Sequence, residues 1–117
     1  MIILSMNIRG VGGTHKILAL RRVCELVRPD VLLIQETMVS VDKALEVFSK
    51  VLGRWYMCAV DANGFSGGFL SAWNPNLALF DVYKSTAGIM LKGQVSNSVQ
   101  VINILNCYGP YKHRIPF

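Results

Sequence analysis

A short apolar run within Asp30 to Thr37 constrains the fold of this chain more than any other stretch. Val31 to Ile34 are four consecutive apolar residues, and Pro29 stops a helix from running into them. A run of this length and composition predicts a strand that is buried on both faces, in the middle of a sheet. The run ends in Gln35-Glu36-Thr37, so it places one carboxylate at a strand end, where ligands bind in layered α/β proteins.

The first residues of the chain repeat this design. Met1 to Asn7 is an apolar run that ends in a polar residue, and a glycine-rich loop, 8–13, follows it. If the two strands are parallel neighbours, the side chains of Asn7 and Glu36 leave the sheet side by side. These two residues are therefore the first candidate site residues.

Two helices and a series of hairpins complete the predicted elements. Apolar residues recur every three or four positions in 14–27 and in 41–52, which predicts amphipathic helices capped by Thr14 and Ser40. The first helix joins two strands, so that unit is expected to be parallel and right-handed. From residue 55 to 108, turn formers recur roughly every eight to twelve residues, which predicts an antiparallel meander. We expect its strands at 55–60, 67–73, 77–84, 89–95 and 99–108.

Size and composition indicate one domain that has a partner or is incomplete. With 117 residues the chain has room for a single domain. Hydrophobic residues make up 52% and charged residues 16%, against roughly 25% charged residues in typical domains. This is more apolar surface than an independent domain of this size needs. The net charge of +5 is compatible with a polyanionic partner, although the cationic residues form no continuous run.

Neither a membrane protein nor a secreted one is indicated. No apolar segment reaches the roughly 20 residues of a membrane-spanning helix, and the amino terminus lacks the pattern of a signal peptide. We therefore expect a soluble, intracellular chain, nuclear or cytoplasmic, with no membrane partner. The cysteines Cys24, Cys58 and Cys107 are widely spaced and lie in apolar segments. This predicts free, buried thiols rather than disulfides or a zinc site.

The glycine-rich loop raises one alternative, a dinucleotide-binding fold. Gly10-Val11-Gly12-Gly13-Thr14-His15 begins like the G-x-G-x-x-G fingerprint, and an acidic residue ends the next strand. However, His15 stands where the third glycine belongs, and hairpins follow where further strand-helix units would be needed. The sequence as a whole therefore disfavours this alternative.

Five short motifs together resemble the endonuclease/exonuclease/phosphatase superfamily, in the form found at the start of plant-type LINE (non-LTR) retrotransposon polyproteins. The first motif is Asn7-Ile8-Arg9-Gly10, and the segment from Pro29 to Thr37 resembles the metal-site strand of that superfamily. The later motifs follow in order: Ser66-Gly67-Gly68, Trp73-Asn74 and Asn106-Cys107-Tyr108-Gly109-Pro110. Together these motifs span nearly the whole chain. Met6 departs from the pattern, because many members have an aromatic residue there.

The resemblance implies a fold and a chemistry. The fold class is α/β (α+β), the amino-terminal half of a four-layered αββα two-sheet sandwich with a mixed sheet and helices on its outer face. The chemistry is phosphodiester hydrolysis on DNA, in which Mg²⁺ or Mn²⁺ neutralises negative charge while water attacks, without a small-molecule cofactor. By resemblance, Glu36 and Asn7 belong to the metal site, Glu36 as the ligand and Asn7 orienting it or a water. Tyr108 would donate its hydroxyl to a phosphate oxygen, and Arg9 would meet the nucleic-acid backbone.

The rest of the superfamily's catalytic set is absent from this sequence. Neither the Gly-Asp-x-Asn stretch nor the Ser-Asp-His motif occurs, and His15 and His113 are expected to be surface residues. Residues 1–117 are therefore interpreted as a partial domain whose carboxyl-terminal half is missing. The expected function is the amino-terminal portion of a DNA-nicking retroelement endonuclease, inactive as this fragment. Two alternatives stay open: a non-catalytic remnant or nucleic-acid-binding piece, and an inositol-phosphate or sphingolipid phosphatase branch of the same superfamily.

Overall fold

The computed structural model describes residues 1–62 and 67–107 of the chain, which form two helices and seven strands. The elements are β1 (Ile3–Asn7), α1 (Thr14–Val27), β2 (Val31–Gln35), α2 (Val41–Leu52), β3 (Tyr56–Val60), β4 (Phe69–Trp73), β5 (Ala78–Ser85), β6 (Gly88–Val95) and β7 (Val101–Asn106). Every predicted element is present, and the described bounds differ from the predicted ones by a residue or two. Neither helix of the described residues is long and apolar enough to cross a membrane.

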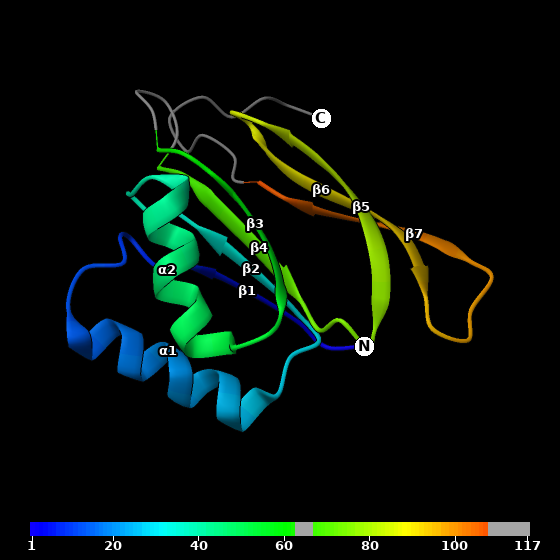
Figure 1. The fold of residues 1–117 in the computed structure, drawn as a ribbon, viewed down its shortest axis with the longest axis horizontal. Helices are drawn as coiled ribbons and strands as arrows, with labels where there is room; N and C mark the ends of the chain where they lie inside the picture. The colour runs from blue at the N-terminus through cyan, green and yellow to red at the C-terminus, as the bar shows by residue number, and fades with distance from the viewer. Residues whose placement is uncertain (63–66, 108–117) are drawn as a thin grey trace, which may run out of the picture.

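The strands form two sheets that are stacked on each other (Figure 1). The first sheet has the order β1-β2-β4-β3 and the second sheet has the order β5-β6-β7. β1 and β2 are parallel and all other neighbours are antiparallel, so the first sheet is mixed. Both helices cover one face of the first sheet, and the second sheet packs on its other face. The predicted class, with two sheets and helices on the outer face, is confirmed.

The antiparallel meander predicted from residue 55 to 108 is divided between the two sheets. β3 and β4 form a hairpin that pairs with β2 through β4, and so it belongs to the first sheet. β5, β6 and β7 form a separate meander, the second sheet. The prediction of one continuous meander is therefore wrong, because the pattern of strands and turns does not record which sheet a hairpin joins.

β2 occupies the centre of the core, as its apolar run predicts. All five of its residues are buried, and the strand lies between β1 and β4. Leu32 and Ile34 pack against the helices in one cluster, whereas Val31 and Leu33 pack against the second sheet in another. This alternation is the period of a strand whose two faces are both covered. β2 therefore reaches the surface only beyond its ends.

The helix caps agree with the sequence in α2 but not in α1. Ser40 caps α2, where its Oγ accepts a hydrogen bond from the Lys43 amide at 3.2 Å, and Gly53 follows the last turn. The prediction that Thr14 caps α1 is wrong, because Thr14 is already the first helical residue. Gly13 stands at the cap position and has no side chain to accept a hydrogen bond. The first turn of α1 thus lacks the stabilisation that Ser40 gives to α2.

The cysteines are free, as predicted, but they are more accessible than predicted. Cys24 and Cys58 are half-buried, and Cys107 is exposed. Burial raises the pKa of the Cys24 thiol and that of the Cys58 thiol, and the charge of Lys84 offsets part of this rise at Cys58. The expectation of three buried thiols is therefore wrong for Cys107, since it follows the last residue of β7 and has left the core.

The sandwich is open along β1. β7 packs over β2 and β4, β6 packs over β4 and β3, and β5 packs over β3. No described strand packs over β1 to a similar extent. Leu4 and Met6 of β1 are partly buried on the helix side, whereas Ile3, Ser5 and Asn7 alternate with them and are exposed. The edges of β1 and β7 consequently open on the same side of the molecule.

Candidate active site

β1 and β2 end side by side, which brings the first two candidate residues together. Asn7 is the register partner of Gln35, and Glu36 is the next residue. The two segments stay hydrogen-bonded beyond the strands, from the Ile8 amide to the Gln35 carbonyl at 3.1 Å and from the Gly10 amide to the Glu36 carbonyl at 2.6 Å. The predicted parallel pairing is confirmed, so Asn7 and Glu36 leave neighbouring strand ends at the same edge of the sheet.

Glu36 has a backbone conformation that is uncommon for a residue with a side chain. Its φ is 56° and that of Met38 is 60°, both in the left-handed region. Thr37 between them is fully buried, and its amide donates to the Gly68 carbonyl at 3.4 Å. The chain therefore turns sharply out of β2 at Glu36, whose side chain is left half-exposed. Residues held in such conformations cluster at functional sites.

Gly67 and Gly68 allow this bend to pack against the start of β4. The Met38 amide donates to the Gly67 carbonyl at 2.5 Å. A side chain on Gly67 would press on Glu36 and Met38, and one on Gly68 would overlap Oγ1 of Thr37. Gly68 also has a φ of 91°, which favours glycine. The glycine pair of the third motif is thus explained by the close approach of two backbones beside Glu36.

A buried pair of amide side chains, Gln35 and Asn106, lies next to Glu36, and neither residue was predicted to belong to the site. Gln35 Nε2 donates to Asn106 Oδ1 at 2.8 Å, which connects the first sheet to the second. Both side chains are more than nine-tenths buried. The signal in the sequence is a polar residue at the last position of each strand, Gln35 after the apolar run of β2 and Asn106 after Ile104 and Leu105 in β7. That signal shows that each residue is unusual, but it does not show that the two meet.

Cationic residues accompany the loop that follows Asn7. Arg9 is exposed, and its amide donates to Oδ1 of Asn7 at 3.1 Å. Lys16, in the first turns of α1, donates from Nζ to the carbonyl oxygens of Ile8 at 2.9 Å and Arg9 at 3.3 Å. Sequence reasoning named Arg9 but missed Lys16, because its role depends on how α1 folds back over the loop. Two positive charges therefore lie at the loop beside the candidate site.

The residues at this edge can supply part of a site for a hard divalent cation. Carboxylate and carbonyl-type oxygens are the ligands that suit Mg²⁺. No described residue donates a hydrogen bond to the Glu36 carboxylate or forms an ion pair with it. Within residues 1–62 and 67–107, however, no group of three or more His, Cys, Asp and Glu side chains could hold a metal ion. The donor set fits Mg²⁺ in kind and is incomplete in number.

The third predicted catalytic residue, Tyr108, lies outside the described residues, as does His113. The strand before Tyr108 ends at Asn106, whose side chain reaches Gln35. The catalytic role of Tyr108 therefore stays a prediction. His15 is exposed on α1, which agrees with the expectation that it is a surface residue.

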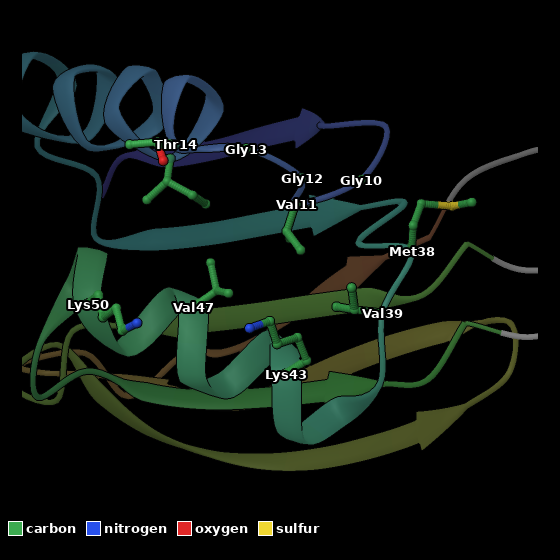
Figure 2. A pocket seen from close by; sticks show the side chains of 11 residues that line it. Gly10, Val11, Gly12, Gly13, Thr14, Met38, Val39, Lys43, Val47 and Lys50 are labelled. Carbon is green, nitrogen blue, oxygen red and sulfur yellow. The ribbon is translucent and has the colours of Figure 1, made fainter.

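An open cavity lies on the helix side of the molecule, and Gly10 and Met38, which are next to the candidate site, form part of its lining (Figure 2). It has a volume of about 610 Å³ and lies between the loop at 10–13, the start of α1 and one side of α2. Valine side chains form much of its lining, and Lys43 and Lys50 contribute amino groups from α2. Neither Asn7 nor Glu36 lines this cavity.

Solved structures share the fold of this chain. The AP endonuclease LMAP from Leishmania major matches with a TM-score of 0.67 at 18% identity, over 91% of this chain and 39% of its own. The catalytic domain of Xenopus laevis APE2 matches with a TM-score of 0.66 at 14% identity, over 94% of this chain and 45% of its own. A humanized D. rerio TDP2 matches with a TM-score of 0.63 at 17% identity, over 90% of this chain and 45% of its own. No family profile matches the sequence, and no curated protein matches it.

These matches define the fold and its extent. The two sheets and two helices are part of the endonuclease/exonuclease/phosphatase-type fold, as the sequence motifs imply. The chain spans less than half the length of the structures that it matches.

Proposed function

We propose that this chain is the amino-terminal part of a divalent-metal-dependent phosphodiesterase, and specifically of the DNA-nicking endonuclease of a LINE-type retroelement. One observation carries the proposal: Glu36 stands in a strained turn at the carboxyl end of the central strand, beside Asn7. The fold shared with an AP endonuclease supports DNA as the substrate. The order of the sequence motifs supports the retroelement branch. Such an enzyme works inside the cell, in the nucleus or the cytoplasm.

In this proposal Glu36 and Asn7 form the near side of the metal site. The cation, Mg²⁺ or Mn²⁺, supplies neutralisation of the charge that develops on the phosphodiester. Glu36 holds the cation through its carboxylate. The Arg9 amide, at 3.1 Å, uses one lone pair of Asn7 Oδ1, which leaves its second lone pair and the Nδ2 donors to orient a water or a phosphate oxygen. Tyr108 donates its hydroxyl to a phosphate oxygen, and no small-molecule cofactor takes part.

The loop after Asn7 is proposed to meet the DNA backbone. The Arg9 guanidinium is exposed and can pair with a phosphate in a bidentate manner. The amino group of Lys16 is bound to two carbonyl oxygens of that loop, at 2.9 and 3.3 Å. Lys16 therefore holds the loop that presents Arg9, rather than contacting the phosphate itself.

The proposal includes a carboxyl-terminal half that completes the domain. The matched structures are more than twice as long as the part that this chain covers, and the sandwich is open along β1 and β7. Further metal ligands and a general base, which the Gly-Asp-x-Asn and Ser-Asp-His motifs provide in the superfamily, are assigned to that half. Residues 1–117 are thus proposed to be a partial domain.

The chain by itself should not cleave DNA. A positioned general base contributes about 10² to 10⁴ in rate, and a transition-state donor contributes about 10² to 10³. The described residues offer one carboxylate and one amide for these tasks, and no metal-binding cluster. Incubation of the purified chain with supercoiled plasmid and Mg²⁺ should therefore give no nicking above background.

A chimera tests the proposal directly. Joining residues 1–117 to the carboxyl-terminal half of a related endonuclease should restore Mg²⁺-dependent nicking of supercoiled plasmid. Glu36→Gln in the chimera should lower the rate by at least about 10²-fold, since it removes the proposed metal ligand. Glu25→Gln, which changes an exposed carboxylate on α1, should leave the rate unchanged. Nicking by the chain alone, abolished by EDTA and by Glu36→Gln, would contradict the assignment of the missing groups to another half.

A second candidate is a non-catalytic piece that binds nucleic acid. The absence of a metal-binding cluster among the described residues favours it. A folded chimera that binds DNA through Arg9 but stays inactive with Mg²⁺ or Mn²⁺ would support this candidate over the enzyme.

A further inference from the structure

We infer that Asn106 is a positioning residue for Glu36, acting through Gln35. The inference rests on the proposed metal role of Glu36 and adds a residue that holds it in place. Asn106 is the last residue of β7, in the second sheet, whereas Glu36 follows β2 in the first. The side-chain amide of Asn106 therefore connects the two sheets at the edge where the candidate site lies.

Asn106 holds two neighbouring strands of the first sheet at once. Its side chain is 1% exposed. The two hydrogens of Nδ2 are shared among three acceptors: the carbonyl oxygen of Ile34 in β2 at 3.1 Å, that of Leu70 in β4 at 3.0 Å and Oγ of Ser71 at 3.0 Å. Oδ1 accepts from Gln35 Nε2 at 2.8 Å. Every polar atom of this amide is thus satisfied, and all its partners belong to the first sheet.

Packing alone would favour a different residue at this position. Ile102 and Ile104 occupy the preceding inward positions of β7, so a third isoleucine would continue the apolar pattern. A buried amide costs free energy unless its donors and acceptors find partners, and it gives directional contacts that an isoleucine cannot give. The amide therefore replaces apolar packing at the one inward position of β7 that lies next to the candidate site.

The buried polar groups of the molecule gather in the same place. Among the described residues, the buried polar side chains are those of Gln35, Thr37, Ser71 and Asn106. Gln35 and Thr37 flank Glu36 in the sequence, and Ser71 and Gln35 are both hydrogen-bonded to Asn106. Apart from the indole Nε1 of Trp73, at the other end of β4, the remainder of the described core is apolar. These four buried polar side chains therefore lie together, next to the turn of the backbone at Glu36.

The connection to the carboxylate runs through Gln35. Gln35 Nε2 is held by Asn106 Oδ1 and also lies 3.1 Å from Oγ of Ser5 in β1. Glu36 follows directly, with the left-handed φ of 56°. The side chain before this turn is fixed to β1 and β7, and it adds to the backbone hydrogen bonds that hold Glu36, Thr37 and Met38 in the turn. The binding of Mg²⁺ and Mn²⁺ depends on ligand geometry, so a Glu36 carboxylate that is not held in one position should bind these ions more weakly.

The test measures metal binding rather than activity, with Mn²⁺ as the probe. Paramagnetic broadening of the Glu36 and Asn7 amide signals is followed in ¹⁵N-labelled chain, under conditions where sedimentation shows a monomer. Asn106→Ala should raise the Mn²⁺ dissociation constant at Glu36 by about 10-fold, the lower end of the effect of outer ligand supports. Asn103→Ala, on an exposed position of the same strand, should change it less than about twofold. Each titration is made well below the melting temperature of its variant, so that lost stability does not reduce the folded fraction.

Gln35→Met gives a second variant that separates positioning from folding. It removes the bond to Oδ1 of Asn106 and keeps the Nδ2 bonds that hold β2 to β4. A weaker Mn²⁺ affinity in folded Gln35→Met would support the inference even if Asn106→Ala did not fold. Wild-type affinity in either folded variant would overturn the inference and leave the metal role of Glu36 intact. If Mn²⁺ did not broaden the Glu36 signal of the unmodified chain, both the metal role and the inference would be overturned.

Discussion

A methyl group at position 67 would lie 3.0 Å from both Cα and Cγ of Glu36, so the backbone of Gly67 packs directly against the backbone and side chain of Glu36. The same methyl group would lie 2.9 Å from Sδ of Met38, which can move aside, but the Cα of Glu36 cannot do so without shifting the turn. The orientation of the carboxylate therefore depends on the absence of a side chain across from it.

Gly67→Ala should lower the free energy of unfolding by about 1 to 3 kcal/mol, the usual cost of adding a carbon to a tightly packed place. Urea denaturation followed by circular dichroism measures this. Gly12→Ala is the matched control, because a Cβ there has no neighbour within 4 Å. A glycine at an unstrained, open position gains about 0.4 to 1 kcal/mol on becoming alanine, so the two variants should change stability in opposite directions. Equal changes in the free energy of unfolding of the two variants would mean that the turn at Glu36 can shift to accommodate a methyl group without loss of stability.

The two helix starts provide a second comparison. Ser40→Ala should destabilise the chain by about 0.5 to 2 kcal/mol, because it removes the acceptor for the Lys43 amide. Thr14→Ala should change stability by less than about 0.5 kcal/mol, because Thr14 makes no cap hydrogen bond. The midpoints of urea denaturation of both variants give the difference. A larger loss from Thr14→Ala than from Ser40→Ala would show that the start of α1 is held differently from the geometry seen here.

Thiol labelling tests the exposure of the three cysteines. At pH 8, iodoacetamide should modify Cys107 first, because it is exposed, and Cys24 and Cys58 more slowly. The thiolate is the reactive form, and burial raises the pKa of the Cys24 and Cys58 thiols above their ordinary 9.0, so less thiolate is present at a given pH. Their labelling should keep accelerating above pH 9, which peptide mass spectrometry can follow. In urea all three should react at similar rates, and a Cys107 that stays slow without urea would contradict its exposure.

The raised pKa values of the Cys24 and Cys58 thiols predict that the stability of the folded chain decreases at high pH. A thiol whose pKa is raised in the folded state stays neutral there while the unfolded chain loses the proton. The stabilisation is therefore complete at pH values below the ordinary thiol pKa of 9.0, and it decreases as the pH rises through the raised values. Cys24→Ser and Cys58→Ser should flatten this part of the profile, which urea denaturation at a series of pH values measures.

The open edge along β1 should make the chain self-associate. Unpaired strand edges and exposed apolar residues favour association, and Ile3 on β1 is 43% exposed. Ile3→Lys should therefore shift sedimentation velocity profiles toward the monomer. Leu26→Lys, which changes a leucine 78% exposed on α1, should have little effect, because it lies away from the sheet edge. A wild-type chain that is monodisperse and melts cooperatively as a monomer would argue against the partial domain.

Much of the fold could be predicted because its elements are encoded locally. The apolar run of β2 specifies a strand buried on both faces, and the intervening helix makes β1 and β2 parallel. The assignment of strands to sheets could not be predicted in the same way. β3 and β4 join β2, while β5 starts a new sheet only a few residues after β4. A turn at 74–77 looks the same in sequence whether the chain stays in one sheet or crosses to another.

The candidate site shows a similar division. The meeting of Asn7 and Glu36 follows from parallel strands of similar design, so residue types and spacing were enough to predict it. The left-handed turn at Glu36 could not be predicted, because such φ values are normally signalled by glycine or asparagine. The contact between Gln35 and Asn106 was equally hidden, because it arises only when the two sheets stack. The sequence was enough to predict which residues form the candidate site, but it did not show which residues hold them in position.

The hydrogen bond between Gln35 and Asn106 also sets an order in time. It joins residues 71 positions apart. A contact of this separation stabilises the chain only after a large loop has closed, and closing that loop costs conformational entropy. The β1–α1–β2 unit and the hairpins consist of nearer neighbours and can form first. During synthesis, Glu36 leaves the ribosome long before the residue that fixes its strand end exists. We therefore expect the surroundings of the carboxylate to be among the last parts of the described chain to reach their final arrangement.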